Sequence, residues 1–419
     1  MRNVGRHAVG PERPLLSLIA TGLSVLAIIL VASGCSVSKR GNMEPAAQRP
    51  VEIAVFVGTY TSWGQTRSEG VYVYNMDPAT GALKPAGVGK GVVNPSFVTV
   101  DPQARYLFSA NEAGKVEGKP AGGVAAFAID PKTKALTLLN QQYYPDGGPC
   151  YVCVEQTGKY ALTANYGKGD VVMVPIAADG KAGPPTDTVQ HQGSSVNPDR
   201  QKGPHAHSIS TDPGNRYAYA ADLGLDKILI YEMDLKRGKL VPHGDGKVKP
   251  GSGPRHLAFH PSGRYAYVIN ELNSTMTAFA CDPEKGTLEE MQTLSTLPDD
   301  FKRQSFCADV HVSPSGEFVY GSNRGHDSIA IFAIDEKTGK LAPVGWQPTG
   351  GKTPRGFAID PTGNFLLAAN QDTNTIVVFR IDSQTGKLTQ AGPATDVPVP
   401  VCVKVVSYGE GGKVLAVSK

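Results

Sequence analysis

The sequence predicts an all-β protein, a seven-bladed β-propeller with four antiparallel strands in each blade. Three observations predict this fold. Short β-rich segments recur with a period of roughly fifty residues, which is typical of propeller blades. Turns that contain Pro and Gly, or Thr and Gly, separate these segments, and such turns favour hairpins over strand–helix–strand units. No amphipathic helical pattern competes with the strands in the repeated region.

The N-terminus lies outside the repeats and has the composition of an export signal. Three arginines precede an apolar segment from Leu15 to Val31, and the small residues at 32–34 precede Cys35. The segment ASGC resembles a bacterial lipobox, in which the cysteine becomes the acylated first residue of the mature protein. We therefore expect residues 1–34 to be a lipoprotein-type signal peptide. An ordinary cleaved signal peptide and an uncleaved anchor are the alternatives.

Residues 35–50 read as a flexible tether that begins with Cys35 as the lipidated residue, and residues 51–419 as the propeller domain. Lipid chains at the N-terminus would hold this domain at a membrane without a spanning helix. We expect an exported protein, periplasmic or at the cell surface, that touches the membrane only through its lipid and is otherwise a monomer.

Six full copies of the repeat follow the tether. The clearest are PRHLAFHPSGRYAYVIN at 254–270 and PRGFAIDPTGNFLLAAN at 354–370, and related segments begin at Pro95, Pro149, Pro204 and Phe306. Each copy has an apolar run, a turn, and a second β-rich run that usually ends in Asn or Asp. A third run, a Thr-Gly turn and a fourth extended stretch complete the unit. One such blade cannot cover its own apolar faces, so neighbouring blades pack around an axis.

A seventh copy is divided between the two ends of the repeated region. Residues 55–61 and 71–74 match the second and third strands, and residues 400–405 match the missing first strand. Pairing the N- and C-terminal strands would close the ring and remove a free sheet edge. Six blades with a decorated terminus are the alternative.

The bulk composition excludes some classes of function. The chain has 41 Lys and Arg against 38 Asp and Glu, a net charge of +3, with no basic run, which argues against nucleic-acid binding. Five cysteines remain besides Cys35, an odd and scattered number that does not indicate a disulfide framework. Cys150 and Cys153 have the spacing of a redox pair, but they fall in a predicted strand, where small buried residues are expected.

Two positions differ between the repeats where the other positions agree, and these are the candidates for function. Six residues before the turn proline stand Ser96, Cys150, His207, Arg255, Ala308 and Arg355, and ten residues after it stand Glu112, Tyr166, Leu223, Glu271, Arg324 and Gln371. The first position starts the innermost strand and the second follows the next strand. Both should lie at the same end of the ring, so the sequence predicts a polar pocket at the mouth of the channel.

The residues of this pocket have definite chemistry. Guanidinium groups can bind a carboxylate or phosphate, or polarise a carbonyl. His207 can accept a proton near neutral pH, and Glu271 can orient the arginines or act as an acid or base. Solvated ion pairs without function are the alternative. His205 and His207 would share one face of a strand, which makes a metal conceivable, but no third ligand has suitable spacing and we expect no metal site.

With these residues, the chain resembles the 6-phosphogluconolactonase family of seven-bladed lactonases, which is related to the fungal muconate-lactonizing enzymes. The residues that carry the resemblance are VGTYT at 57–61, GPHAH at 203–207, GPRHL at 253–257, NEL at 270–272 and SNR at 322–324. The resemblance implies lactone hydrolysis without a cofactor, and it implies catalytic roles for His207, Arg255, Glu271 and Arg324. We expect the substrate to be bound by His205, Arg355, Glu112, Tyr166 and Gln371.

The export signal leaves the substrate open. A phosphogluconolactonase of sugar metabolism belongs in the cytosol, and phosphorylated sugar lactones are scarce outside the inner membrane. The expected function is hydrolysis of a sugar or phosphosugar lactone. The alternatives are a surface-anchored propeller that binds a ligand or protein without catalysis, and a cycloisomerase-type reaction in the same pocket. The polar insert at 180–202 is longer than a typical connection and could be a lid or a contact loop.

Overall fold

The computed structural model describes residues 51–62, 64, 67–116, 118–120, 122–144 and 148–418. The expected signal peptide and tether lie outside the described residues. The described residues form strands, short turns and one 3-10 turn (η1, Glu410–Gly412), without an α-helix. No helix in this part of the chain is long and apolar enough to cross a membrane.

Seven sheets of at least four antiparallel strands form the domain, which confirms the predicted fold class. Six are continuous in sequence, and their strands are as follows: β4 (Pro95–Val100), β5 (Tyr106–Asn111), β8 (Gly123–Ile129), β9 (Leu136–Tyr143); β10 (Tyr151–Val154), β11 (Tyr160–Asn165), β12 (Asp170–Pro175), β13 (Asp187–Gln190); β14 (Ala206–Thr211), β15 (Tyr217–Asp222), β16 (Lys227–Asp234), β17 (Lys239–Lys247); β18 (Pro254–Phe259), β19 (Tyr265–Asn270), β20 (Thr275–Asp282), β21 (Thr287–Ser295); β22 (Phe306–Val312), β23 (Phe318–Arg324), β24 (Ser328–Ile334), β25 (Leu341–Pro348); β26 (Pro354–Ile359), β27 (Phe365–Asn370), β28 (Thr375–Ile381), β29 (Leu388–Gln390). A short strand, β30 (Thr395–Asp396), pairs with β28, and β6 (Lys115–Val116) and β7 (Lys119–Pro120) form a small separate hairpin.

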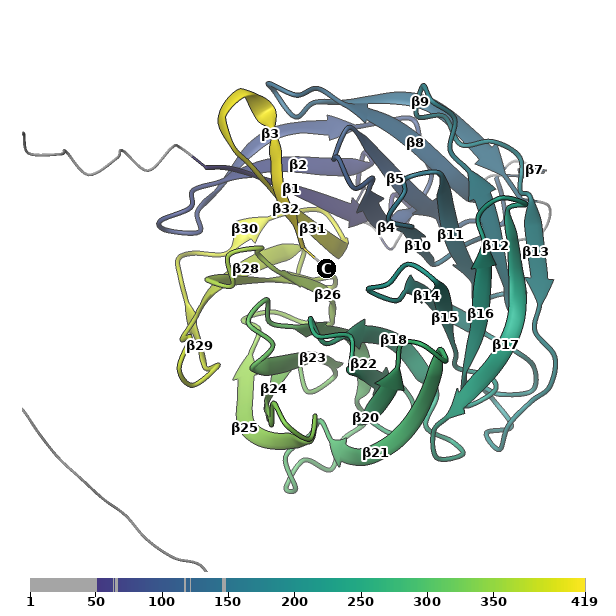
Figure 1. Ribbon diagram of the computed structural model, residues 1–419. Helices are drawn as coiled ribbons and strands as arrows, with labels where there is room; N and C mark the ends of the chain where they lie inside the picture. Colours follow the sequence, from purple (N-terminus) through teal and green to yellow (C-terminus); the bar gives the residue numbers. More distant parts are fainter. Residues whose placement is uncertain are drawn as a thin grey trace, which may run out of the picture. The chain divides into compact units, whose positions relative to one another are not determined.

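The blades are arranged around a central axis, with the first strand of each of the six continuous blades nearest the centre (Figure 1). Apolar clusters fill the space between neighbouring blades. One of them joins Tyr267 and Met276 of one blade to Val319 and Phe332 of the next, all at most 1% exposed. This packing explains why the apolar positions of the repeat recur.

The turn after each first strand explains a second recurring residue. The carboxylate of Asp101 accepts hydrogen bonds from the backbone N–H groups of Arg105 and Tyr106, both at 2.7 Å, and Asp212 does the same in a later blade. Where the turn proline is replaced, Glu155 takes this role. The recurring acidic residue is therefore structural, because it satisfies backbone donors that the tight turn leaves unpaired.

The seventh blade is built from both ends of the repeated region, as the sequence predicts. β31 (Pro400–Tyr408) pairs antiparallel with β1 (Glu52–Thr59), and β2 (Val71–Met76) and β3 (Leu83–Gly89) complete the blade. The pairing runs from Glu52 opposite Tyr408 to Thr59 opposite Pro400. Side chains of β1 and β31 are almost wholly buried, so the closure is part of the core.

An additional strand, β32 (Val414–Val417), lies on the inner side of β31 and was not expected from the repeat. Val406 pairs with Val417, and the N–H and hydroxyl of Ser418 bond to the backbone of Val405. The ammonium group of Lys404 donates to the carbonyl oxygen of Ser418 at 3.1 Å. Residues of this strand line a cavity of about 540 Å³ in the half of the channel next to the turns.

Candidate active site

The first variable position of the repeat coincides with a β-bulge in the innermost strand. In six blades one extra residue interrupts the pairing of the first two strands. In four of them this residue is Ser96, His207, Arg255 or Arg355, in the divided blade it is Val401, and in the blade of β22 the bulge falls at Ala308 and Asp309. A bulge frees the extra residue from the ladder and re-aims its side chain. The bulge therefore explains how a strand that packs inside a blade also presents one side chain to the channel.

Ser96, His207, Arg255, Arg355 and the equivalent Val401 line one small pocket, with a cavity volume of about 10 Å³. Its walls are Ser96, Phe97, Glu112, Cys150, His207, Arg255, His256, Arg355 and Val401. Four predicted site residues and Cys150 line this pocket. A fifth predicted residue, Glu271, contacts the Arg255 side chain directly. The assignment of their roles stays a prediction.

The second variable position is held beside the first by the backbone. The N–H of Glu271 donates to the carbonyl oxygen of Gly253 at 2.7 Å, and the N–H of Glu112 donates to that of Asn94 at 2.9 Å. Gly253 and Asn94 lie just before the innermost strands β18 and β4. Both variable positions therefore lie at the same end of the blade, as the sequence analysis expects.

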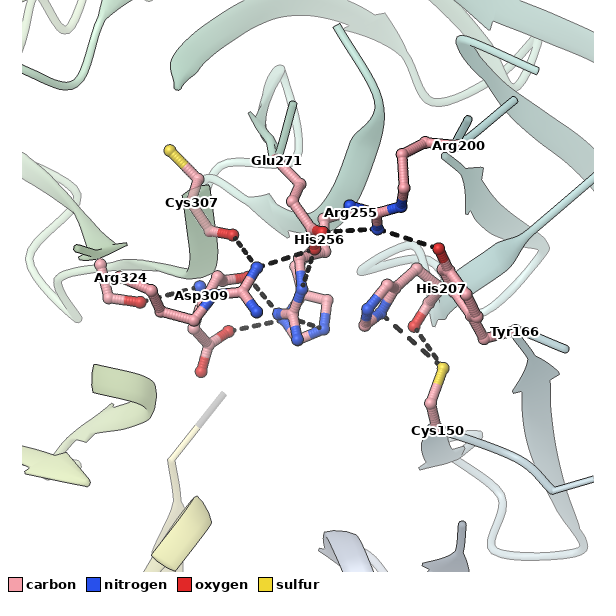
Figure 2. A network of polar contacts seen from close by, with 12 residues as sticks. Cys150, Tyr166, Arg200, His207, Arg255, His256, Glu271, Cys307, Asp309 and Arg324 are labelled. Atoms are coloured by element: carbon pink, nitrogen blue, oxygen red, sulfur yellow. Dashed lines mark hydrogen bonds and ion pairs between the residues drawn. The ribbon is translucent and has the colours of Figure 1, made fainter. Parts of the chain in front are cut away.

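Glu271 is the centre of a cluster of three arginines (Figure 2). Its Oε2 lies 3.0 Å from Nε of Arg255 and 2.9 Å from Nη2 of Arg324, and its Oε1 lies 2.8 Å from Nη2 of Arg200. The Glu271 side chain is only 6% exposed. Burial opposes its charge, but the three arginines outweigh burial and lower the pKa of the carboxyl to about 2. Glu271 is therefore ionised at neutral pH and is a weak base.

His207 lies beside this cluster and is buried. Its Nδ1 is 3.7 Å from Sγ of Cys150, which also donates to the backbone oxygen of His207. Burial, and then the charge of Arg255, lowers the pKa of His207 well below its usual value, so the imidazole is neutral. Burial also raises the pKa of the Cys150 thiol, which keeps the sulfur protonated and excludes it as a nucleophile at neutral pH.

Tyr166 and His205 form one wall next to His207. Their rings stack with centroids 4.6 Å apart, and Nδ1 of His205 bonds to the carbonyl oxygen of Tyr166 at 2.9 Å. The expectation that His205 and His207 share one face of a strand is wrong, because His205 precedes β14 and His207 is the bulged residue. Among residues 51–418, as far as described, no cluster of three His, Cys, Asp or Glu could hold a metal ion.

A second charged group lies across the pocket. The hydroxyl of Tyr60 donates to Oε2 of Glu112 at 2.7 Å, and the guanidinium of Arg355 lies over the Tyr60 ring, 5.4 Å from its centroid. Within the described part of the chain, Arg355 has no hydrogen-bond or ion-pair partner. Tyr60 was missed by the sequence analysis, although it follows Thr59 at the second variable position of the divided blade.

The sequence analysis also missed Arg200, which lies in the insert. The first part of the insert is ordinary: residues 187–190 form β13, the outer strand of their blade. The loop after it brings the Arg200 guanidinium to Tyr166 and Glu271, with 2.9 Å from Nη2 to the Tyr166 hydroxyl. No repeat contains an equivalent residue, so alignment of the blades could not reveal it.

Gln371 is the one predicted binding residue without a contact to this group. Its side chain is buried, and its amide donates to Asp372 at 3.0 Å. Together with Arg200, the other predicted residues place four guanidiniums and the carboxylates of Glu112 and Glu271 at the channel mouth. This group of residues therefore has an excess of positive charge. Such a site favours an anionic ligand and can stabilise a developing oxyanion.

Comparison with known proteins gives the same fold and a family. A family model described as "Lactonase, 7-bladed beta-propeller" matches residues 54–405. The chain is similar to 6-phosphogluconolactonase of Bacillus subtilis, 40% identical over 349 residues that cover 83% of this chain and 97% of that protein. It is also similar to 6-phosphogluconolactonase of Formosa agariphila, 35% identical over 73% of this chain and 86% of that protein.

Among solved structures, the chain is similar to the periplasmic gluconolactonase PpgL of Pseudomonas aeruginosa. The TM-score is 0.78 and the identity 33%, over 84% of this chain and 99% of that one. The seven-bladed ring and the residues of the pocket are consistent with these matches. This chain belongs to the seven-bladed lactonase family.

Proposed function

We propose that the protein hydrolyses a small sugar lactone in the pocket at the channel mouth, and that it does so outside the cytoplasm. The observation that carries the proposal is the position of a neutral imidazole beside a cluster of guanidiniums in one buried pocket. Lactone hydrolysis needs a base for water and donors for the oxyanion, and these two kinds of group supply them.

In the proposed reaction His207 accepts a proton from water as the water oxygen attacks the lactone carbonyl carbon. Among the described residues, Nε2 of His207 has no hydrogen-bond partner, so it is available for this role. The guanidiniums of Arg255 and Arg355 stabilise the oxyanion of the tetrahedral intermediate. The ring C–O bond then breaks, and the leaving oxygen takes the proton from His207. The acid product releases one proton to solvent at neutral pH.

Glu271 is less suited to be the base, because its pKa of about 2 and its three arginine partners make it a poor proton acceptor. Its role in the proposal is to orient Arg255 and Arg324. The negative charge that develops on the lactone carbonyl oxygen would raise the pKa of His207 towards neutrality, where general base catalysis is most effective.

Two observations support a location outside the cytoplasm. The first 34 residues have the pattern of a lipoprotein signal, and a similar solved structure, 33% identical, is named a periplasmic gluconolactonase. An unphosphorylated sugar lactone suits that location. Labelling of Cys35 by a radioactive fatty acid in growing cells, and its loss in Cys35→Ser, tests the anchor.

The activity is tested by proton release from glucono-1,5-lactone and from its 6-phosphate, at constant pH, with and without a chelator. We expect turnover of at least one lactone above the uncatalysed rate, and loss of about 10²–10⁴ in kcat in His207→Gln. Binding of the lactones without turnover would favour the non-catalytic alternative. A cyclised product in place of the hydroxy acid would favour the cycloisomerase alternative.

A further inference from the structure

His256 follows the bulged Arg255 on β18, and no role has been given to it so far. Its side chain is buried and lines the pocket. Aromatic rings fix it from two sides: the His256 ring centroid lies 5.1 Å from that of Tyr151 and 5.8 Å from that of Phe97, both edge-on. The ring therefore has little freedom to rotate.

The partners of its two ring nitrogens determine where the proton lies. Nε2 of His256 is 3.2 Å from Nη1 of Arg255, and Nδ1 is 2.8 Å from Oδ1 of Asp309 (Figure 2). A guanidinium has only donors, so Nε2 must be the acceptor. The proton is then on Nδ1, which donates it to the carboxylate. No other neutral tautomer satisfies both contacts.

The surroundings of Asp309 keep its side chain ionised. It lies at the bulge of β22 and accepts further hydrogen bonds from the N–H of Val310 at 3.0 Å and from Nε2 of His311 at 3.2 Å. Burial would raise the pKa of Asp309, but His311 and His256 lower it well below its usual value. An ionised acceptor at this point favours the Nδ1–H tautomer of His256.

Arg255 is held from three directions as a result. Nε faces Glu271, and Nη1 donates both to the carbonyl oxygen of Ala308 and to His256. We propose that His256 and Asp309 are positioning residues: Asp309 fixes the tautomer of His256, and His256 fixes the Arg255 guanidinium in the orientation that faces the reacting carbonyl. The inference rests on the proposed function, because it assigns Arg255 to the oxyanion.

The arrangement makes activity sensitive to acid. A protonated His256 would present an N–H to Arg255 in place of a lone pair, and the two like charges would repel. The charged and titratable groups around His256 are Arg255, Asp309, His311, His207 and Tyr151. Burial and the charge of Arg255 lower the pKa of His256 to about 4. We expect kcat to fall as the pH drops through this value.

The kinetic test compares His256→Leu with His256→Gln in the purified protein. We expect kcat of His256→Leu to fall about 10- to 100-fold, a loss typical of removing a group that orients an active residue, with KM changed less. His256→Gln should recover part of kcat, because its amide oxygen can accept from Arg255. The decline of kcat near pH 4 should be less steep in His256→Gln, where protonation of the base His207 is the remaining cause.

His260→Gln is the matched control. It removes a similarly buried imidazole from the turn that follows the same strand, where it bonds to Ser262 and to the carbonyl oxygen of Gly316. This variant should keep the wild-type kcat and its decline near pH 4. A folded His256→Leu with kcat within about threefold of the wild type would overturn the inference, as would a decline near pH 4 that is as steep in His256→Gln as in the wild type.

A spectroscopic measurement decides the inference without turnover. Nitrogen-15 NMR of histidine-labelled protein, assigned with His256→Gln, should show His256 as the Nδ1–H tautomer at pH 7. An Nε2–H tautomer would contradict the inference even if lactones are hydrolysed. If the wild type hydrolyses no lactone, the proposed function fails, and the tautomer still reports whether Asp309 and His256 hold Arg255. The same spectrum decides the matter if His256→Leu does not fold.

Discussion

At the scale of single residues, the three arginines around Glu271 are not equivalent. Arg255 and Arg324 also donate to backbone carbonyl oxygens, of Ala308 and Cys307, and their side chains are 3% and 16% exposed. Among the described residues, the Arg200 guanidinium bonds to side chains alone, and it is 35% exposed. Arg255 and Arg324 are therefore fixed, whereas Arg200 is able to change partners when a substrate enters.

Replacement of Arg255 by alanine should abolish most turnover. We expect kcat/KM to fall by about 10²–10³, the loss seen when one oxyanion donor is removed, while circular dichroism stays that of the wild type. Arg216→Ala, which removes an exposed arginine from a turn, is the control. Full turnover in Arg255→Ala would refute the role in the oxyanion site.

Replacement of Arg200 by glutamine should act mainly on binding. Hydrogen bonds to charged groups contribute about 1.5–3 kcal/mol, so we expect KM to rise at least about tenfold, with a smaller change in kcat. Lys202→Gln removes an exposed charge two residues away and should keep the wild-type KM. Equal increases of KM in both variants would mean that positive charge near the pocket attracts the substrate at long range and that the contacts of Arg200 contribute nothing specific.

At the scale of elements, buried hydrogen bonds fix the loop of the insert at residues 191–202 to the neighbouring blade. Nδ1 of His191 bonds to Asp222 at 2.6 Å, and Tyr231 bonds to the other ring nitrogen at 2.9 Å. Further along, the buried amide of Gln201 donates to the carbonyl oxygen of Leu223 at 2.8 Å. The backbone at Arg200 is thereby held close to the pocket, so the insert delivers a side chain to the site.

Loss of the Gln201 amide should loosen this loop. In Gln201→Ala a backbone donor and an acceptor lose their partners, at about 1–3 kcal/mol for each buried group left unpaired. We expect a lower melting temperature, faster hydrogen exchange confined to residues 192–203, and a higher KM like that of Arg200→Gln. Gln192→Ala, at an exposed residue of the same loop, should cause none of these. Unchanged exchange in Gln201→Ala would show that other contacts suffice.

At the scale of the whole molecule, stability and activity share the same groups. The ring closes through β1 and β31. The channel between the blades holds buried titratable groups, and the neighbours of each group determine whether it is charged or neutral. Groups whose pKa differs between the folded and unfolded states make stability depend on pH.

The buried groups predict that stability decreases in acid. His207 and His256 have pKa values below the unfolded value of about 6.5. The unfolded state therefore binds more protons than the folded state below that pH. Glu271, lowered to about 2, acts in the same direction below about pH 4.3. We expect the melting temperature to be constant between about pH 6.5 and 8, below the unfolded pKa of cysteine, and to fall progressively towards pH 3, less steeply in His256→Gln. A flat profile would contradict these pKa values.

Much of this structure could be predicted from internal repetition. The repeat predicts the strands, the closure and the two variable positions, because hairpins of one length repeat their side-chain directions. It could not predict Arg200, which belongs to a loop present once, or Asp309, whose blade has an alanine at the aligned position. The repeat could not predict β32 either, because none of the other blades has an equivalent strand. The pairing of His256 with Asp309 depends on contacts between blades, which no single repeat contains.

The bulges have a consequence for how related chains diverge. A bulged residue has no partner across the ladder, so its identity matters little for folding but directly alters the pocket. Ser96 and Val401 occupy such places in the pocket wall without charge. A new side chain there would reach the bound molecule while the hairpins assemble as before. Descendants of this scaffold can therefore acquire different specificities through one change at a time.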